Sequence, residues 1–140
     1  MKRNWIILGA VSGAIAVVLG AFGAHGLRTT LDDTGLEVWR TAVRYQMFHA
    51  VALLVVGVLE RAGASAPRPR ALALAGWALS VGTVLFSGSL YCLALGGPSL
   101  LGPLTPLGGA AFVLGWGALA LAGRGERSGW RGGGGPAPPR

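Results

Sequence analysis

The side chains of this sequence that could take part in chemistry are few, and they interrupt otherwise apolar stretches. Two histidines, His25 and His49, carry imidazoles, which can bind a metal or haem iron and can transfer protons. Gln46 precedes His49 by three residues, so a helix would place both side chains on one face. The other polar candidates carry hydroxyl groups, and they are Ser87, Tyr91 and Thr105. These residue types favour hydrogen bonding, ligand binding or proton transfer.

Most catalytic and cofactor classes lack the residues that they need. Two imidazoles with no neighbouring carboxylate form an incomplete zinc site. The uncharged stretches contain no Asp or Glu, which argues against a proton-coupled exporter. The glycine-rich segment 20–26 lacks the Lys-Ser/Thr ending of a phosphate-binding loop, and segment 86–89 lacks the spacing of a nucleophile elbow. We therefore assign no catalytic residue, no metal ligand and no cofactor, and the sequence leaves enzymatic activity undecided.

The elements that carry these residues are long and uncharged. Of the 140 residues, 52% are hydrophobic and 12% are charged, against about 25% charged in a typical soluble domain. Charged residues are absent from 4–27, 45–59 and 71–123, and a transmembrane helix needs about 20 residues. The sequence therefore predicts an all-α, integral membrane four-helix bundle with up-down topology. The predicted spans cover about residues 5–27, 41–60, 71–95 and 104–123.

Two of these spans allow another interpretation. The first follows a basic start and resembles a signal peptide, although its apolar run exceeds the usual 7–15 residues. The second has few uncharged residues between Arg44 and Glu60, so a re-entrant segment is the alternative unless Arg44 reaches back to the headgroups.

Thr34 and Glu37 have the spacing of a capping box, which predicts a helix that starts near Thr34 and continues into this span.

The distribution of Lys and Arg predicts that both termini lie in the cytoplasm. In that orientation Trp39 and Tyr45 lie in the outer aromatic belt, and the polar residues of all four spans gather in the outer half of the bundle. We expect this polar cluster either to hold the helices in register or to bind a small ligand. A haem- or metal-binding redox protein that uses His25 and His49, and a small carrier or channel, are the alternatives. The predicted cluster comprises His25, Gln46, His49, Ser87, Tyr91 and Thr105.

The remaining predictions concern domains and partners. Residues 1–123 are predicted to form the transmembrane domain, and residues 124–140, rich in Gly, Pro and Arg, a disordered cytoplasmic tail. Gly9, Gly13 and Gly20 recur at helical spacing, so this face could pack closely against a second copy in a homo-oligomer. The net charge of +7 lies in loops and tails, where lipid headgroups explain it better than nucleic acid. The expected partner is the lipid bilayer, and the expected location is the plasma (inner) membrane, with multiple spans.

Four sequence strings together resemble a known family. They are Gly20–Leu27, Thr41–Ala50, Phe86–Tyr91 and Thr105–Gly109. In this combination the chain is similar to the bacterial YgdD-like family of small integral membrane proteins of unknown function. The resemblance implies a four-span inner-membrane protein and no known catalytic residues. The expected function is thus that of an integral membrane protein of unknown biochemical activity.

Overall fold

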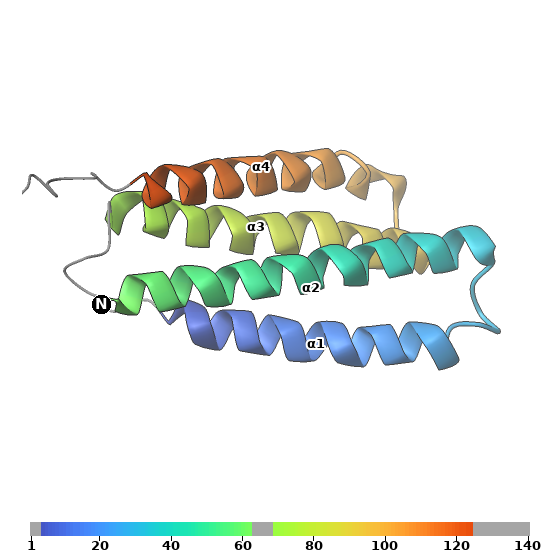
Figure 1. Cartoon of the computed structure of the whole chain (residues 1–140). Coiled ribbons are helices and arrows are strands. Elements are labelled where there is room, and N and C mark those ends of the chain that lie inside the picture. Colours follow the sequence, from blue (N-terminus) through green and yellow to red (C-terminus); the bar gives the residue numbers. More distant parts are fainter. Residues whose placement is uncertain (1–3, 63–68, 125–140) are drawn as a thin grey trace, which may run out of the picture.

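The computed structural model describes residues 4–62 and 69–124, which form antiparallel helices that alternate in direction (Figure 1). The described residues contain no strand, and this confirms the predicted all-α fold with four helices. All four α-helices are long and apolar enough to cross a membrane. Except for Arg124, the predicted tail lies outside the described residues. The elements are α1 (Trp5–His25), α2 (Asp33–Arg61), α3 (Pro69–Ala94), the short 3-10 helix η2 (Ser99–Leu101) and α4 (Leu104–Gly123).

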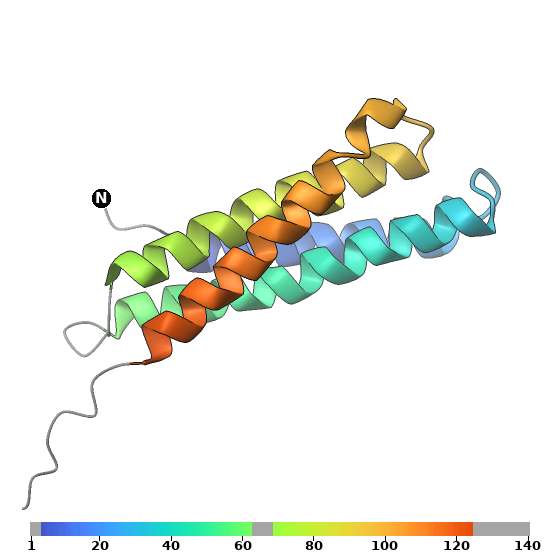
Figure 2. The same cartoon turned by 90° about the horizontal axis from the view of Figure 1, so that it is seen from above.

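The helices form layers. Helices α2 and α3 pack side by side in the middle, with α1 against one face of this pair and α4 against the other (Figures 1 and 2). Trp5 of α1 packs against both middle helices, at Gly57 of α2 and Gly76 of α3. On the opposite face, Phe112 of α4 lies over Gly82 of α3. The pair α2–α3 therefore separates the side chains of α1 from those of α4.

The small residues of α1 serve packing within the chain. A Cβ atom added to Gly9 would lie 2.8 Å from the carbonyl oxygen of Ala50 in α2, and one added to Gly20 would lie 3.3 Å from Val43. Gly13 faces the same helix, 3.8 Å from the Cβ of Ala50. Helix α2 thus occupies the face on which we expected a second copy. The connection between His25 and Asp33 is short, so α2 packs on α1 within the same chain. A dimer through these glycines would have to displace α2.

Helix α2 starts at Asp33, close to the predicted start near Thr34, but a different residue caps it. Its N-cap is Asp32, whose Oδ1 accepts a hydrogen bond from the backbone N–H of Gly35 at 2.7 Å, so the predicted capping box at Thr34 is wrong. Asp caps a helix at least as well as Thr, and it stands one turn before an available N–H. From Asp33 the helix continues unbroken to Arg61, which does not support a re-entrant segment.

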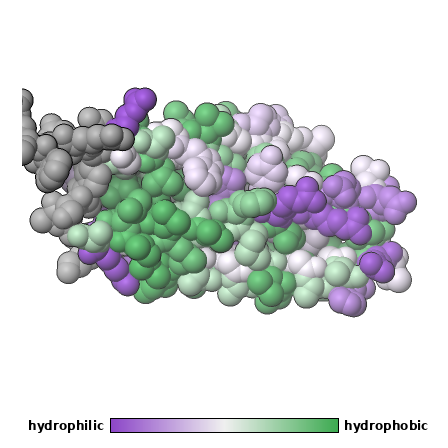
Figure 3. Space-filling view, in the orientation of Figure 1, coloured by the Kyte–Doolittle hydropathy of each residue, from purple (hydrophilic) through white to green (hydrophobic). Residues whose placement is uncertain are grey.

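Helix α2 is longer than the apolar layer of a membrane is thick, and its first part is polar. Its 29 residues extend about 44 Å, whereas the hydrocarbon core is about 30 Å thick. Glu37 and Arg40 form an exposed ion pair of 3.7 Å in this first part. In Figure 3 most hydrophilic residues of the visible face gather at the end where α1 connects to α2. Hydrophobic residues predominate over the rest of the coloured surface. This end of the molecule is therefore suited to the headgroup region.

Candidate functional site

Gln46 and Tyr91 are the two members of the predicted polar cluster that meet directly. The Tyr91 hydroxyl donates a hydrogen bond to Gln46 Oε1 at 2.9 Å. The amide Nε2 of Gln46 donates to the backbone carbonyl of Ser12 at 3.0 Å. One buried amide thereby connects α2 to both α1 and α3. Polar groups in an apolar layer need hydrogen-bond partners. The two bonds of Gln46 therefore hold α1, α2 and α3 in a fixed register along the bundle axis.

His49 turns toward the opposite face, where α4 packs. Its Nδ1 lies 2.6 Å from the backbone carbonyl of Tyr45, and the indole N–H of Trp116 donates to its Nε2 at 3.2 Å. A carbonyl only accepts and an indole only donates, so these partners require the neutral imidazole that carries its proton on Nδ1. The ring also stacks on Phe112, with centroids 3.4 Å apart. Both nitrogens are therefore engaged, and neither is free to bind a metal or haem iron.

His25 does not join His49. It is exposed at the end of α1, and its Nδ1 lies 3.2 Å from the carbonyl of Ala21 in its own helix. Trp39, which contacts α1 at Gly23, precedes His49 by about 15 Å along α2, and His25 lies still further toward the end where α1 connects to α2. Within the described residues, no group of three or more His, Cys, Asp or Glu side chains could hold a metal. This arrangement does not fit the haem or metal site proposed for the two histidines.

The other two hydroxyl residues of the predicted cluster, Ser87 and Thr105, form no hydrogen bond with Gln46, His49 or Tyr91 among the described residues. Thr105 at the start of α4 hydrogen-bonds the hydroxyl of Ser89 at 2.7 Å, a contact that the sequence analysis did not anticipate. Ser87 is fully buried, and its hydroxyl has no hydrogen-bond partner. Trp116 was also missed, although a tryptophan N–H in an apolar helix needs an acceptor. That requirement was the one available signal for the contact with His49.

An open groove runs along the face where His49 meets α4, with a volume of about 750 Å³. We call it the aromatic groove, because rings form most of its wall. Tyr45 stacks on Phe86 with centroids 4.4 Å apart, and Phe86 lies 5.6 Å from Phe112. The volume falls within the range of small-molecule sites, about 300–1,000 Å³. The groove is lined by Arg44, Tyr45, Phe48, His49, Phe86, Gly109, Phe112, Val113 and Trp116.

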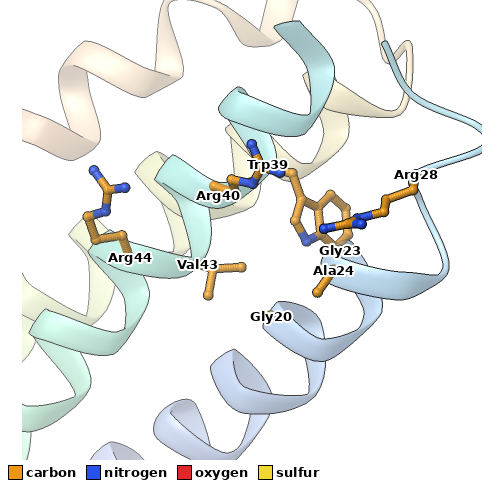
Figure 4. Close-up of a pocket in the computed structure, with 8 residues that line it drawn as sticks. All are labelled: Gly20, Gly23, Ala24, Arg28, Trp39, Arg40, Val43 and Arg44. Atoms are coloured by element: carbon orange, nitrogen blue, oxygen red, sulfur yellow. The ribbon is translucent and has the colours of Figure 1, made fainter. Parts of the chain in front are cut away.

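A second hollow, which we call the arginine pocket, lies between α1 and α2 at their connected ends (Figure 4). Its volume is about 270 Å³. Trp39 forms one wall, and its indole N–H donates to the carbonyl of Leu19 in α1 at 2.9 Å. The pocket is lined by Gly20, Gly23, Ala24, Arg28, Trp39, Arg40, Val43 and Arg44. The arginines are exposed, so the pocket combines a buried apolar wall with solvent-accessible cationic side chains.

Four apolar helices, each long enough to cross a membrane and joined by hydrogen bonds of their buried polar side chains, define a polytopic helical membrane protein. The chain belongs to the family described as protein of unknown function (DUF423), whose model matches residues 19–109. It is 47% identical to the UPF0382 membrane protein YwdK of Bacillus subtilis, over 86% of this chain and 95% of the relative. It is 46% identical to a UPF0382 membrane protein of Staphylococcus epidermidis, over 86% of this chain and 94% of the relative. No solved structure gives a significant match.

These comparisons confirm the predicted membrane protein of an uncharacterised family. They do not test the name YgdD-like. The matched segment contains all three arginines of the arginine pocket and the residues Gln46, His49 and Tyr91, and it ends before Trp116. Both hollows thus draw most of their walls from the part of the chain that defines the family.

Proposed function

We propose that this chain is a non-enzymatic plasma-membrane protein whose aromatic groove holds an amphipathic molecule with a long apolar part. The observation that carries the proposal is the groove itself, a hollow of about 750 Å³ between α2 and α4 at the depth of the apolar layer. Its size suits a small ligand, and its wall consists mainly of ring faces. The polar contacts around it have a structural role, since they hold the helices that form the wall.

The wall favours apolar contact over hydrogen bonding. The polar atoms of His49 and Trp116 bond to each other or to the backbone, so they offer little to a ligand. Phe48 and Val113 are largely exposed and present apolar surface to the groove. Of the described residues that line the groove, Arg44 alone carries a full charge. A ligand with an apolar body and an acidic or polar end therefore complements this wall.

We also propose the finer assignments that the sequence suggested. Both termini lie in the cytoplasm, residues 1–123 form the transmembrane domain, and residues 124–140 form a cytoplasmic tail. The YgdD-like proteins and the family matched here form one group under this proposal. The excess of Lys and Arg on the side of the termini supports the orientation.

Gly109 offers a direct test of the groove. A Cβ atom at Gly109 would meet only the ring of Phe86, at 3.9 Å, so Gly109→Leu fits and extends into the groove. Gly117 lies on the same helix outside the groove, with nothing within 4 Å of its Cβ, and Gly117→Leu is the matched control. Native mass spectrometry of the purified protein should find a bound amphiphile in the wild type and the control, and lose it in Gly109→Leu. Equal retention in both variants, or no bound molecule in the wild type, would contradict the proposal.

The carrier or channel alternative makes a different prediction about water. Ser87 is buried in the bundle and its hydroxyl has no partner. Under our proposal, Ser87→Cys in a chain without its natural cysteine resists a water-soluble maleimide. Rapid labelling at this position would favour a water-filled path instead.

A further inference from the structure

We infer that the arginine pocket binds a phosphate group, carried by an anionic lipid headgroup or free in solution. The inference does not depend on the aromatic groove, which lies on the other side of α2 and shares only Arg44 with the pocket. It rests on the shape of the pocket, on its charges and on its place at the end of the bundle.

The wall of the pocket is rigid. A Cβ atom at Gly23 would lie 2.5 Å from Cδ1 of Trp39, so the indole ring rests directly on the backbone of α1. Its N–H is held by the carbonyl of Leu19, and the ring of Tyr91 packs on it with centroids 4.7 Å apart. Trp39 is almost completely buried as a result. A ligand that enters this pocket therefore meets a preformed surface.

The charges of the pocket have one sign. Figure 4 shows Arg28 reaching from the connection after α1 toward Trp39, with Arg40 on the other side of the indole ring and Arg44 one turn further along α2. Among the residues that the structure describes, no carboxylate lines the pocket. Glu37 contacts Arg40 at 3.7 Å, but both side chains are more than half exposed, so this pair is weak. Arg28 and Arg44 have no carboxylate within ion-pair distance among the described residues.

The site selects a small anion by its size and by its donors. Guanidinium groups donate paired hydrogen bonds that match phosphate oxygens. The volume of about 270 Å³ lies just below the usual range for whole ligands, about 300–1,000 Å³, and suits a headgroup or a free anion. The carboxyl end of α1 adds a partial negative charge nearby, so binding must depend on the arginines.

In the membrane, the pocket lies at the depth of the phospholipid phosphate groups. Arg28 follows the end of α1, and Arg40 belongs to the first turns of α2 that extend beyond the apolar layer. Phospholipid phosphates lie in the same region, next to the hydrocarbon core. A lipid headgroup can enter this pocket from the membrane side, and an inorganic phosphate can enter it from water.

The test uses the full chain in nanodiscs of phosphatidylcholine that contain a minor fraction of phosphatidylglycerol. Arg28→Gln combined with Arg40→Gln removes two cations from the pocket and leaves Arg44 in place. Arg61→Gln, at the opposite end of α2, is the matched control for charge. Native mass spectrometry then measures retained phosphatidylglycerol, and ³¹P NMR of detergent-solubilised protein measures binding of inorganic phosphate.

We expect phosphatidylglycerol retention to fall about five-fold for each pocket arginine removed and to stay near the wild-type value in Arg61→Gln. If inorganic phosphate also binds, and binds more weakly in the double variant, the site takes phosphate from either source. If inorganic phosphate does not bind, the lipid headgroup is its ligand. Equal losses of retention in the double variant and in Arg61→Gln, or no preference for phosphatidylglycerol in the wild type together with no binding of inorganic phosphate, would overturn the inference.

Discussion

The bridge through Gln46 yields a quantitative prediction. Gln46→Leu keeps a side chain of similar size but removes the hydrogen bonds to the Ser12 carbonyl and to the Tyr91 hydroxyl. Hydrogen bonds between membrane helices contribute about 0.6 kcal/mol on average and up to about 1.7 kcal/mol. Loss of both bonds should therefore lower the free energy of unfolding by about 1 to 3 kcal/mol. Tyr91→Phe removes only the second bond and should cost about 0.6 to 1.7 kcal/mol.

A double-mutant cycle isolates the shared bond. Since Gln46→Leu has already removed the partner of Tyr91, adding Tyr91→Phe should cost less than it does in the wild type. The coupling free energy should be about 1 kcal/mol. Unfolding in mixed micelles, or steric trapping in bicelles, measures each free energy of unfolding.

A suitable control is Thr83→Val. The Thr83 hydroxyl donates only to the carbonyl of Leu79 in its own helix, so its loss breaks no contact between helices. The stability of this variant should stay within about 0.5 kcal/mol of the wild type. A coupling free energy within about 0.3 kcal/mol of zero, or a Gln46→Leu variant more stable than the wild type, would refute the role of Gln46 as a bridge.

Two further predictions concern packing and orientation. Gly23→Ala should lower stability by about 1 to 3 kcal/mol, because the new methyl group collides with Trp39; Gly88→Ala, where a Cβ has nothing within 4 Å, should not destabilise the protein when both are compared by thermal unfolding. In intact cells with the natural cysteine removed, Ser99→Cys should react with an impermeant maleimide, whereas Ala62→Cys should react only after permeabilisation. The opposite labelling pattern would reverse the proposed orientation.

The sequence was sufficient to predict the helices but not their lateral order. Long uncharged runs predict where a chain crosses a membrane, and that prediction is confirmed for four helices. Hydropathy does not determine which helix lies beside which, because every order keeps apolar residues in the apolar layer. The expected meeting of all polar residues in one cluster required the polar side chains of the four helices to face one another at one depth. The structure places the pair α2–α3 between α1 and α4, so Gln46 faces α1 while His49 faces α4.

Individual contacts between helices depend on how each helix is rotated about its own axis, and the sequence does not reveal this rotation. Ser87 and Ser89 lie about 200° apart around α3, since each residue turns a helix by about 100°. Only Ser89 faces the hydroxyl of Thr105. Trp39 was expected in the aromatic belt, yet it is 3% exposed. Trp39 is buried because Gly23 has no side chain in the way. The two residues lie on different helices, so no local sequence pattern predicts that they pack together.

The order of the layers also has a consequence for how the protein is made. Each helix packs chiefly on the helix synthesised just before it. Newly inserted helices can therefore dock on the preceding helix as they leave the translocon. The hydrogen bond of His49 to Trp116 forms only after α4 is inserted. Both hydrogen-bond partners of Gln46 belong to α1 and α3, so they are available before α4 is inserted. Helix α4 is inserted last and packs on the face of α2 and α3 that α1 does not cover.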